Sequence, residues 1–370
     1  MKKILTVLFC LSLTVLAGSL TACHIHVFRE WEVVEFANPG VKGEETRSCR
    51  CGYTETRETD PIPGSVGLIY ILNEDGESYM VSGVGSCTDT ELVIPATYNG
   101  KPVTTIGEWA FCNCTNLTSV IIPDSVTSIG DGAFERCTSL TSVVIPDGVT
   151  SIGKYALYNC TSLTSVAIGN SVTSIGGVFS NCPSLTSITV NENNTAYQSI
   201  DGNLYTKDGK TLVQYAVGKM DPSFTIPSHV IFIGNSAFCF CESLMSVVIP
   251  DSVTSIGNYA FEMCTSLMSV VIPNGVTSIG NCAFEVCTSL TSVVIPDSVT
   301  SIGYLAFCDC SNLTSVYYGG TESDWTNISI GYFNTDLTFS AHRYYYSETQ
   351  PTEEGNYWHY DEEGNPVGWE

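Results

Sequence analysis

One segment of fourteen residues is written into the chain twice, almost letter for letter. The sequence LTSVVIPDSVTSIG occupies Leu290–Gly303, and it occurs again at Leu140–Gly153 with Gly148 in place of serine. Aligned on a recurring cysteine, related copies follow one another at steps of 23 residues, with one step shortened to 22. A period this short is typical of a solenoid in which each repeat forms one coil.

The residues within one repeat predict short strands. Leu140, Val143 and Ile145 are spaced as the inward side of a strand, and a proline and a turn follow. Val149 and Ile152 supply the next inward pair. A lone coil buries too little apolar surface to offset the conformational entropy of its residues, so neighbouring coils must stack. The sequence therefore predicts a β-rich solenoid with parallel strands and short helical or irregular returns.

The motif LTSVVIPDSVTSIG, followed by Ala-Phe and then cysteine, resembles the leucine-rich repeat of bacterial BspA-type surface proteins. The resemblance covers about Glu91–Tyr318 and recurs in phase. It implies leucine-rich-repeat coils displayed on a cell surface, with adhesion or the binding of a protein or host-matrix ligand as the function. It brings no catalytic residues with it.

Five segments follow from these patterns. They are a signal peptide with a lipobox at 1–22, a small Cys/His-containing segment or linker at 23–64, an N-terminal cap at 65–100, the solenoid at 101–318, and a C-terminal cap with an acidic aromatic tail at 319–370. The cap should contain a hairpin around Asn73–Gly76, and Trp325 should close the last coil.

Residues 191–224 interrupt the solenoid. Two Asp-Gly pairs, at 201–202 and 208–209, predict one or two hairpins that project from the coils. The interruption is either a protrusion that carries specificity or an eroded repeat.

The N-terminus predicts export. Met1-Lys2-Lys3 precedes an apolar stretch that ends at Cys23, in the order typical of a lipoprotein signal. We expect Cys23 to carry a lipid, so that the chain is a membrane-anchored surface lipoprotein, or a secreted protein if no lipid is attached. Its only contact with a membrane should be that lipid anchor.

The composition limits the remaining functions. With 14 basic and 38 acidic side chains the formal charge is −24, which disfavours nucleic acid as a partner. No metalloprotease, nucleophile-elbow or phosphate-loop motif is present, so the sequence predicts neither an enzyme nor a cofactor. Cys23, His24 and His26 with the Cys49-x-Cys51 pair depart from zinc-module spacing, and a lipidated Cys23 could not bind zinc, so no metal is expected.

The 17 cysteines admit either disulfides or free thiols. Those in the repeats occupy one equivalent position and should stack as a buried column. Because parallel Cβ vectors give poor disulfide geometry, this arrangement favours free thiols.

The candidate binding face comes from strand alternation. Ser142 and Val144 lie between inward positions and should face solvent, so the repeats should present a serine column beside an apolar stripe. Such a stripe indicates either an interface or plain β-propensity. The face comprises Ser119, Ile121, Ser142, Val144, Ser246, Val248, Ser269, Val271, Ser292, Val294 and Tyr317. The alternatives to a binding protein are an envelope scaffold without a dedicated ligand and, less favoured, an enzyme acting on surface glycans.

Overall fold

A computed structural model describes residues 32–35, 43–48, 54–59, 63–352 and 354–369. The expected signal peptide, its Cys23, and the Cys49-x-Cys51 pair lie outside the described residues. These residues belong to two units, and the first is an antiparallel sheet with β2 in its centre. Its strands are β1 (Glu32–Glu35), β2 (Gly43–Ser48) and β3 (Thr54–Thr59).

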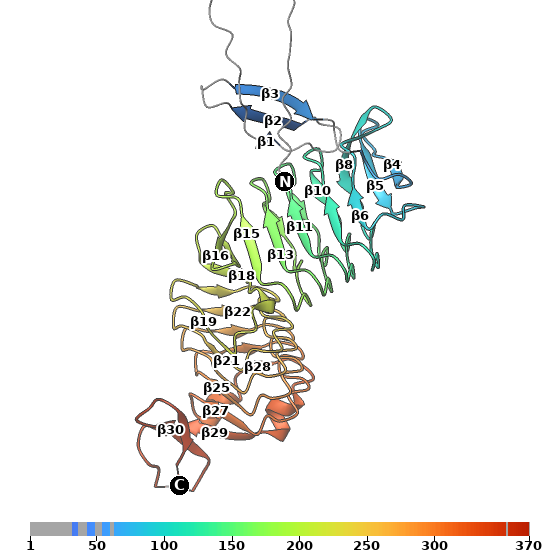
Figure 1. Cartoon of the computed structure of the whole chain (residues 1–370). Coiled ribbons are helices and arrows are strands. Elements are labelled where there is room, and N and C mark those ends of the chain that lie inside the picture. Colours follow the sequence, from blue (N-terminus) through green and yellow to red (C-terminus); the bar gives the residue numbers. More distant parts are fainter. Residues whose placement is uncertain (1–31, 36–42, 49–53, 60–62, 353, 370) are drawn as a thin grey trace, which may run out of the picture. The chain divides into compact units, whose positions relative to one another are not determined.

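In the second unit most repeats form one coil that contributes two short strands, and each strand pairs in parallel with its equivalent in the next coil (Figure 1). The register follows the 23-residue period, as in the pairing of Ser142 with Ser165 and of Ile152 with Ile175. The coils therefore build two sheets, a long-strand sheet and a short-strand sheet. Both sheets are interrupted near residue 190, which divides the array into a first half and a second half.

The first half ends with β14 and β15. Its long-strand sheet consists of β6 (Glu91–Val93), β9 (Ser119–Ile121), β11 (Ser142–Ile145), β13 (Ser165–Ile168) and β15 (Ser187–Val190). Its short-strand sheet consists of β4 (Ile69–Leu72), β5 (Tyr79–Gly83), β8 (Lys101–Ile106), β10 (Ser128–Ile129), β12 (Ser151–Ile152) and β14 (Ser174–Ile175), with β7 (Thr97–Tyr98) paired to β8.

The second half repeats this plan. Its long-strand sheet consists of β19 (Ser223–Thr225), β21 (Ser246–Val248), β23 (Ser269–Val271), β25 (Ser292–Ile295), β27 (Ser315–Tyr318), β29 (His342–Tyr346), β30 (Tyr357–Tyr360) and β31 (Pro366–Gly368). Its other sheet consists of β16 (Tyr197–Ile200), β17 (Asn203–Thr206), β18 (Thr211–Gln214), β20 (Phe232–Ile233), β22 (Ser255–Ile256), β24 (Ser278–Ile279), β26 (Ser301–Ile302) and β28 (Ser329–Ile330). Three helical turns are η1 (Val217–Lys219), α1 (Glu322–Trp325) and η2 (Asp336–Ser340).

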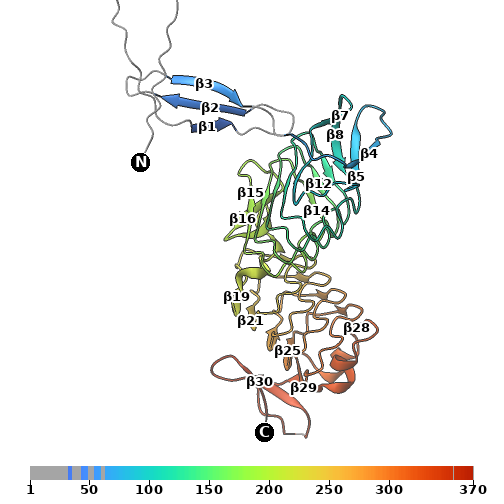
Figure 2. The same cartoon turned by 45° about the vertical axis from the view of Figure 1, so that its right-hand side comes forward.

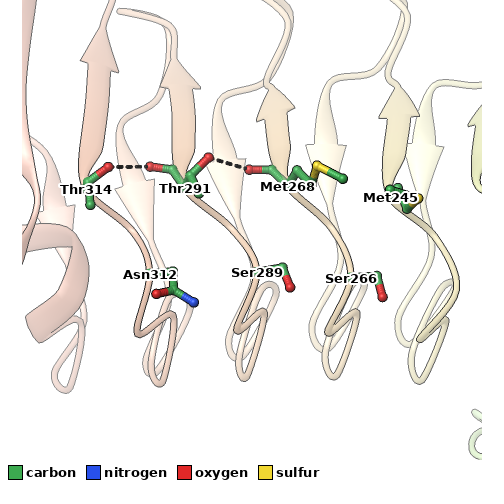
Figure 3. Close-up of a pocket in the computed structure, with 7 residues that line it drawn as sticks. All are labelled: Met245, Ser266, Met268, Ser289, Thr291, Asn312 and Thr314. Atoms are coloured by element: carbon green, nitrogen blue, oxygen red, sulfur yellow. Dashed lines mark hydrogen bonds between the residues drawn. The ribbon is translucent and has the colours of Figure 1, made fainter.

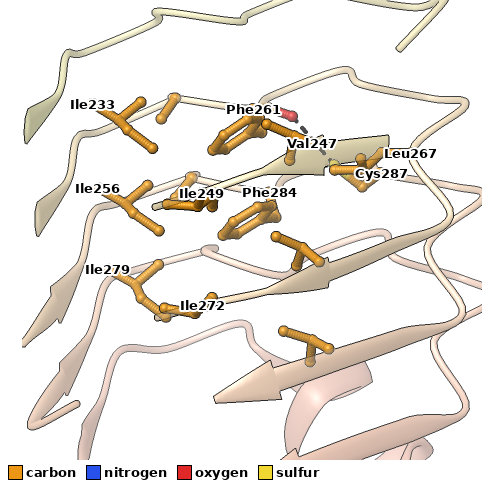
Figure 4. Packing of buried hydrophobic residues seen from close by; sticks show 14 of the residues in the cluster. Ile233, Val247, Ile249, Ile256, Phe261, Leu267, Ile272, Ile279, Phe284 and Cys287 are labelled. Carbon is orange, nitrogen blue, oxygen red and sulfur yellow. Dashed lines mark hydrogen bonds between the residues drawn. The ribbon is translucent and has the colours of Figure 1, made fainter. Parts of the chain in front are cut away.

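The core lies inside the coils, where the sequence places it. Leu140, Val143, Ile145, Val149 and Ile152 are each at most 2% exposed, which confirms their predicted inward orientation. Figure 4 shows the matching columns of isoleucine and phenylalanine in the second half. Successive phenylalanine rings stack from coil to coil, with centroids 4.8–5.1 Å apart between Phe238, Phe261 and Phe284. Each coil thus covers the apolar side of its neighbour.

The return segments of these coils are irregular turns. Two residues in a typical return, such as Tyr259 and Met263, adopt the left-handed conformation, with φ of 58° and 59°. This conformation costs roughly 1–2 kcal/mol for a residue with a side chain. It directs the backbone N–H groups of these two residues to the carbonyls of Asn281 and Glu285 in the next coil, at 2.8 and 2.9 Å. Hydrogen bonds between coils therefore replace those within a helix.

Residues 191–224 join the two halves. Strands β16 and β17 form the antiparallel hairpin that the sequence predicts, but the prediction that it projects from the coils is wrong. Leu204 is buried in the first-half core and the adjacent Tyr205 in the second-half core. The amide of the buried Asn194 donates to the carbonyls of Gly169 and Val172, at 2.8 and 3.0 Å. The insertion is therefore built into the array on both sides.

Both ends of the array are covered. At the N-terminal end, β4 and β5 form the hairpin expected around Asn73–Gly76. At the C-terminal end, Trp325 is buried against Tyr318 with ring centroids 5.2 Å apart, which confirms its predicted position over the last coil. Beyond it, β29 extends the long-strand sheet, and β30 and β31 follow (Figure 2).

Candidate interaction surface

The predicted stripe exists in the first half as a continuous column on the solvent side of the long-strand sheet. Parallel pairing places Val144 beside Ala167 and Ala167 beside Thr189. The Val144 side chain is 63% exposed and the Ile121 side chain 36%. Since these side chains alternate with fully buried neighbours, the rigid ladder of the sheet holds them in a row.

A groove with a volume of about 620 Å³ runs along this column. We call it the stripe groove. Its floor is apolar, and the turns that follow the strands form one rim. The lining residues are Val120, Ile121, Ile122, Asp124, Val144, Ile145, Pro146, Asp147, Ala167, Ile168, Gly169, Thr189, Val190 and Asn191.

In the second half only part of the same column is open. Val248 and Val271 are 58% and 45% exposed, but Val294 is only 4% exposed and Tyr317 is half-buried. The prediction that Val294 faces solvent is therefore wrong. Val293, Val294 and Ile295 are all buried in β25, and Val294 pairs with Tyr317, which packs against aromatic residues from the C-terminal part of the chain.

The cover is a cluster of aromatic side chains. Tyr317 stacks on Tyr344 at 5.2 Å and meets the edge of Trp358 at 5.5 Å. Trp358 is 1% exposed, and its indole Nε1–H donates to the carbonyl of Tyr318 at 2.7 Å. Tyr346 and Tyr360 pack edge-on against Trp358 at 5.2 and 4.9 Å.

The serine column borders both stretches of the stripe. Its members differ in exposure. Ser142, Ser246 and Ser269 are exposed, whereas Ser119 and Ser292 are half-buried.

A second groove was not anticipated from the sequence (Figure 3). It has a volume of about 630 Å³ and lies in the second half, beside the start of the long strands. Met245 and Met268 replace the threonine found here in most other coils, and they are 41% and 45% exposed. The lining residues are Met245, Ser266, Met268, Ser289, Thr291, Asn312 and Thr314.

The threonines at this position bind the preceding coil. The Thr314 hydroxyl donates to the carbonyl of Thr291 at 3.2 Å, and the Thr291 hydroxyl donates to that of Met268 at 3.0 Å. The methionines have no hydroxyl to continue this ladder. The replacement of the recurrent threonine by methionine in two coils is thus the sequence signal that could have revealed this groove.

The sequence profile of the BspA type leucine rich repeat region matches residues 86–205 and 220–336, in six copies, and so covers more than half of the chain. The chain belongs to this family. No curated protein matches it.

Several solved structures of bacterial leucine-rich repeat proteins are similar to this BspA-type chain. A leucine rich cell surface protein of Faecalibacterium prausnitzii is 28% identical over 73% of this chain and 98% of that one, with a TM-score of 0.38. A leucine-rich repeat protein of Bacteroides ovatus is 27% identical over 70% of this chain and 71% of its own, with a TM-score of 0.45. The pneumococcal vaccine antigen PcpA is 17% identical over 86% and 94%, with a TM-score of 0.46.

The cysteines of the BspA-type repeats form buried thiol columns. The Cys287 S–H donates to the carbonyl of Phe261 at 3.2 Å (Figure 4). Cys264 donates to the carbonyl of Phe238 at the same distance. Burial raises the pKa of the Cys182 thiol to about 12 and also raises that of Cys287. All the cysteines that the structure describes are free thiols. Protonated and buried thiols of this kind are structural, because nucleophilic chemistry needs an accessible thiolate.

One carboxyl group of the repeats has a raised pKa. Glu262 is half-buried, and this burial raises its pKa, while a hydrogen bond from the Cys239 thiol at 3.1 Å opposes the shift and nearby Glu285 adds to it. Cys239 has a raised pKa, chiefly through burial, so it is a thiol donor at neutral pH. The pair is explained by repeat packing and does not border either groove.

Metal-binding clusters and membrane-spanning helices are both absent from the described residues. No group of three or more His, Cys, Asp or Glu side chains is placed to hold a metal ion in this part of the chain. Among the same residues, no helix has the length and apolar character needed to cross a membrane.

Proposed function

We propose that this BspA-type protein is an exported surface protein that binds a protein or extracellular-matrix ligand through the solvent side of its long-strand sheet. The observation that carries the proposal is the stripe groove, where Ile121 and Val144 are exposed on a rigid ladder beside a cavity of about 620 Å³. Exposed apolar side chains that form a contiguous strip are typical of interaction sites. The serines beside them supply hydroxyl groups for hydrogen bonds at the rim of such an interface.

Surface display rests on the leader sequence. The basic start, the apolar stretch and Cys23 are those of an exported lipoprotein. A Cys23→Ser variant should lose incorporation of labelled fatty acid and should no longer fractionate with membranes. Retained labelling would contradict the assignment of Cys23 as the lipidated residue.

The binding site is tested with Val144→Glu. The substitution places a charge in the middle of the stripe groove without disturbing a buried residue, since Val144 is 63% exposed. We expect attachment of the purified full-length protein to host-cell and matrix fractions to fall at least tenfold, while the circular dichroism spectrum and the urea midpoint stay unchanged, because burying an unpaired charge in an apolar contact costs more than about 1.4 kcal/mol.

The matched control is Thr150→Glu, which adds the same charge to an exposed position in the same coil, just before β12 of the short-strand sheet. It should leave attachment within twofold of the unmodified protein. Equal attachment by all three proteins would remove the sheet face as the binding site and favour the envelope scaffold. Loss in both variants would show a general effect of charge.

A further inference from the structure

The stripe groove combines an apolar floor with an acidic rim. Asp124 and Asp147 are the only ionisable residues that line it, and the groove has no lysine, arginine or histidine. The two aspartates occupy the same turn position in adjacent coils, so their backbones lie about one strand spacing, ~4.8 Å, apart. Like charges at this distance repel each other, and a cation between or above them would relieve the repulsion.

Neither carboxylate is neutralised within the part of the chain that the structure describes. Asp147 Oδ1 accepts hydrogen bonds from the backbone N–H of Asn170 at 2.7 Å and from Asn191 Nδ2 at 3.3 Å, which orient the carboxylate without cancelling its charge. Among the described residues, no lysine or arginine forms an ion pair with Asp124 or Asp147. The chain as a whole has a formal charge of −24. A positively charged partner is therefore attracted both by the two carboxylates of the rim and by the net negative charge of the whole chain.

The second half of the array shows that aromatic side chains can pack on this column. There the chain covers Val294 and Tyr317 with its own aromatic segment, and Trp358 becomes almost fully buried. The equivalent column in the first half has no such cover from the described residues of the second unit, where Val144 is 63% exposed. The homologous segment of a second copy is a poor occupant, because its stretch from 346 to 369 carries several carboxylates and no lysine or arginine.

We infer that the stripe groove receives an extended protein segment in which lysine or arginine alternates with apolar residues. This inference rests on the proposed function and specifies the chemistry of the partner. The column from Ile121 to Thr189 spans four coils, about 14 Å at ~4.8 Å per coil, which matches four or five residues of extended chain. The apolar side chains of such a segment lie on the floor, and its basic side chains reach Asp124 and Asp147.

The probe is a capped, fluorescent Lys-Val-Lys-Val-Lys peptide, with Glu-Val-Glu-Val-Glu as its charge-reversed control. Binding to the purified full-length protein is measured by fluorescence anisotropy at low and at physiological salt. The basic peptide should bind, should weaken as salt rises, and should lose roughly three- to tenfold in affinity to Asp124→Asn/Asp147→Asn. Val144→Ser, which removes apolar surface without adding a charge that attracts the basic peptide, should also weaken binding.

The matched control is Asp251→Asn/Asp297→Asn. It removes the same charge from the same turn position in the second half, where Asn274 separates the two aspartates. It should change the affinity less than twofold. Equal losses in the two double variants would mean nonspecific attraction to an acidic protein and would overturn the inference, as would tighter binding of the acidic peptide.

Two further outcomes separate this inference from the proposed function. If attachment to host or matrix fractions depends on Val144 but not on the Asp124/Asp147 pair, the binding face stands and the basic segment is wrong. If Val144→Glu instead abolishes a concentration-dependent dimer seen by analytical ultracentrifugation, the occupant is a second copy and the inference is overturned.

Discussion

The first and second halves of the array are built from nearly the same repeat, yet they present the same surface differently. In the first half the apolar column is open, with Val144 63% exposed; in the second half Val294, two repeats after Val248, is 4% exposed beneath a folded aromatic segment. The repeat thus decides which residues share a column. The non-repeating ends decide which part of the column a partner can reach.

The rims of the two halves differ as well. Asp124 and Asp147 stand in adjacent coils, whereas Asp251 and Asp297 have Asn274 between them. The first half therefore concentrates negative charge beside its open column, while the second half spreads it. Small substitutions at one repeat position change the chemistry of a surface without altering the coil.

The largest expected effect comes from the buried cysteine columns, which both halves have in common. Burial raises the pKa of the Cys182 thiol to about 12, above the value of ~8.5 in an unfolded chain. Above pH ~8.5 the unfolded chain releases the thiol proton and the folded chain keeps it, so the stabilisation is complete below this pH and is lost as the pH rises. The free energy of unfolding should fall by about 1.4 kcal/mol per pH unit for each such thiol. The thiols concerned are Cys137, Cys160, Cys182, Cys264, Cys287 and Cys310.

Urea unfolding at about pH 8 and about pH 10 measures how steeply the free energy of unfolding falls with pH. The fall should be smaller in the Cys182→Ala variant, because one buried thiol has been removed. An unchanged slope in this variant, or rapid alkylation of the native protein by iodoacetamide at about pH 8, would contradict the description of the columns.

The next effect tests the cover on the second half. Trp358→Ala removes a buried indole and its hydrogen bond to Tyr318, and should lower the free energy of unfolding by about 3–5 kcal/mol. Hydrogen exchange in β25 and β27 should become faster, because Val294 loses its cover. Trp369→Ala is the matched control, since Trp369 is only half-buried and donates to the carbonyl of Ser347 at 3.0 Å. Its effect should be clearly smaller and should leave β25 protected; equal losses would show that the cover does not depend on Trp358.

The smallest effect compares one column position in the two halves. Val294→Thr buries a hydroxyl group and should cost about 1–3 kcal/mol, whereas Val144→Thr exposes one and should change the free energy of unfolding by less than ~0.5 kcal/mol. Urea denaturation of both variants at neutral pH gives the comparison. Equal values would mean that the two halves are equally open, which would remove the basis for locating the site in the first half.

The sequence was sufficient for most of the coil. Periodicity alone placed Leu140, Val143 and Ile145 in the core and Val144 on the surface, because residues one repeat apart must lie side by side in a stacked ladder. The same argument indicated a column of unpaired cysteines. In these features the residues in contact are separated by a fixed number of positions along the chain, and the repeat period gives that number.

The sequence did not predict contacts made by residues that lie outside the repeats. The burial of Val294 depends on the position of Trp358. The indole of Trp358 donates a hydrogen bond to the carbonyl of Tyr318, 40 residues earlier in the chain, and this contact does not follow the repeat period. The hairpin at β16 and β17 was recognised from its Asp-Gly turn, but its burial depends on Asn194 and Leu204 meeting the cores on either side. The extent of the open column, and so of the proposed binding face, depends on these long-range contacts.

The match between the entry and exit of every coil has an evolutionary consequence. Since each coil within one half ends where the next begins, with strands paired at the same offset, recombination between neighbouring repeats such as Leu267–Gly280 and Leu290–Gly303 can add or delete whole coils without creating a misfit. The length of the exposed column then becomes a heritable variable. Both end caps stay intact when the number of coils between them changes.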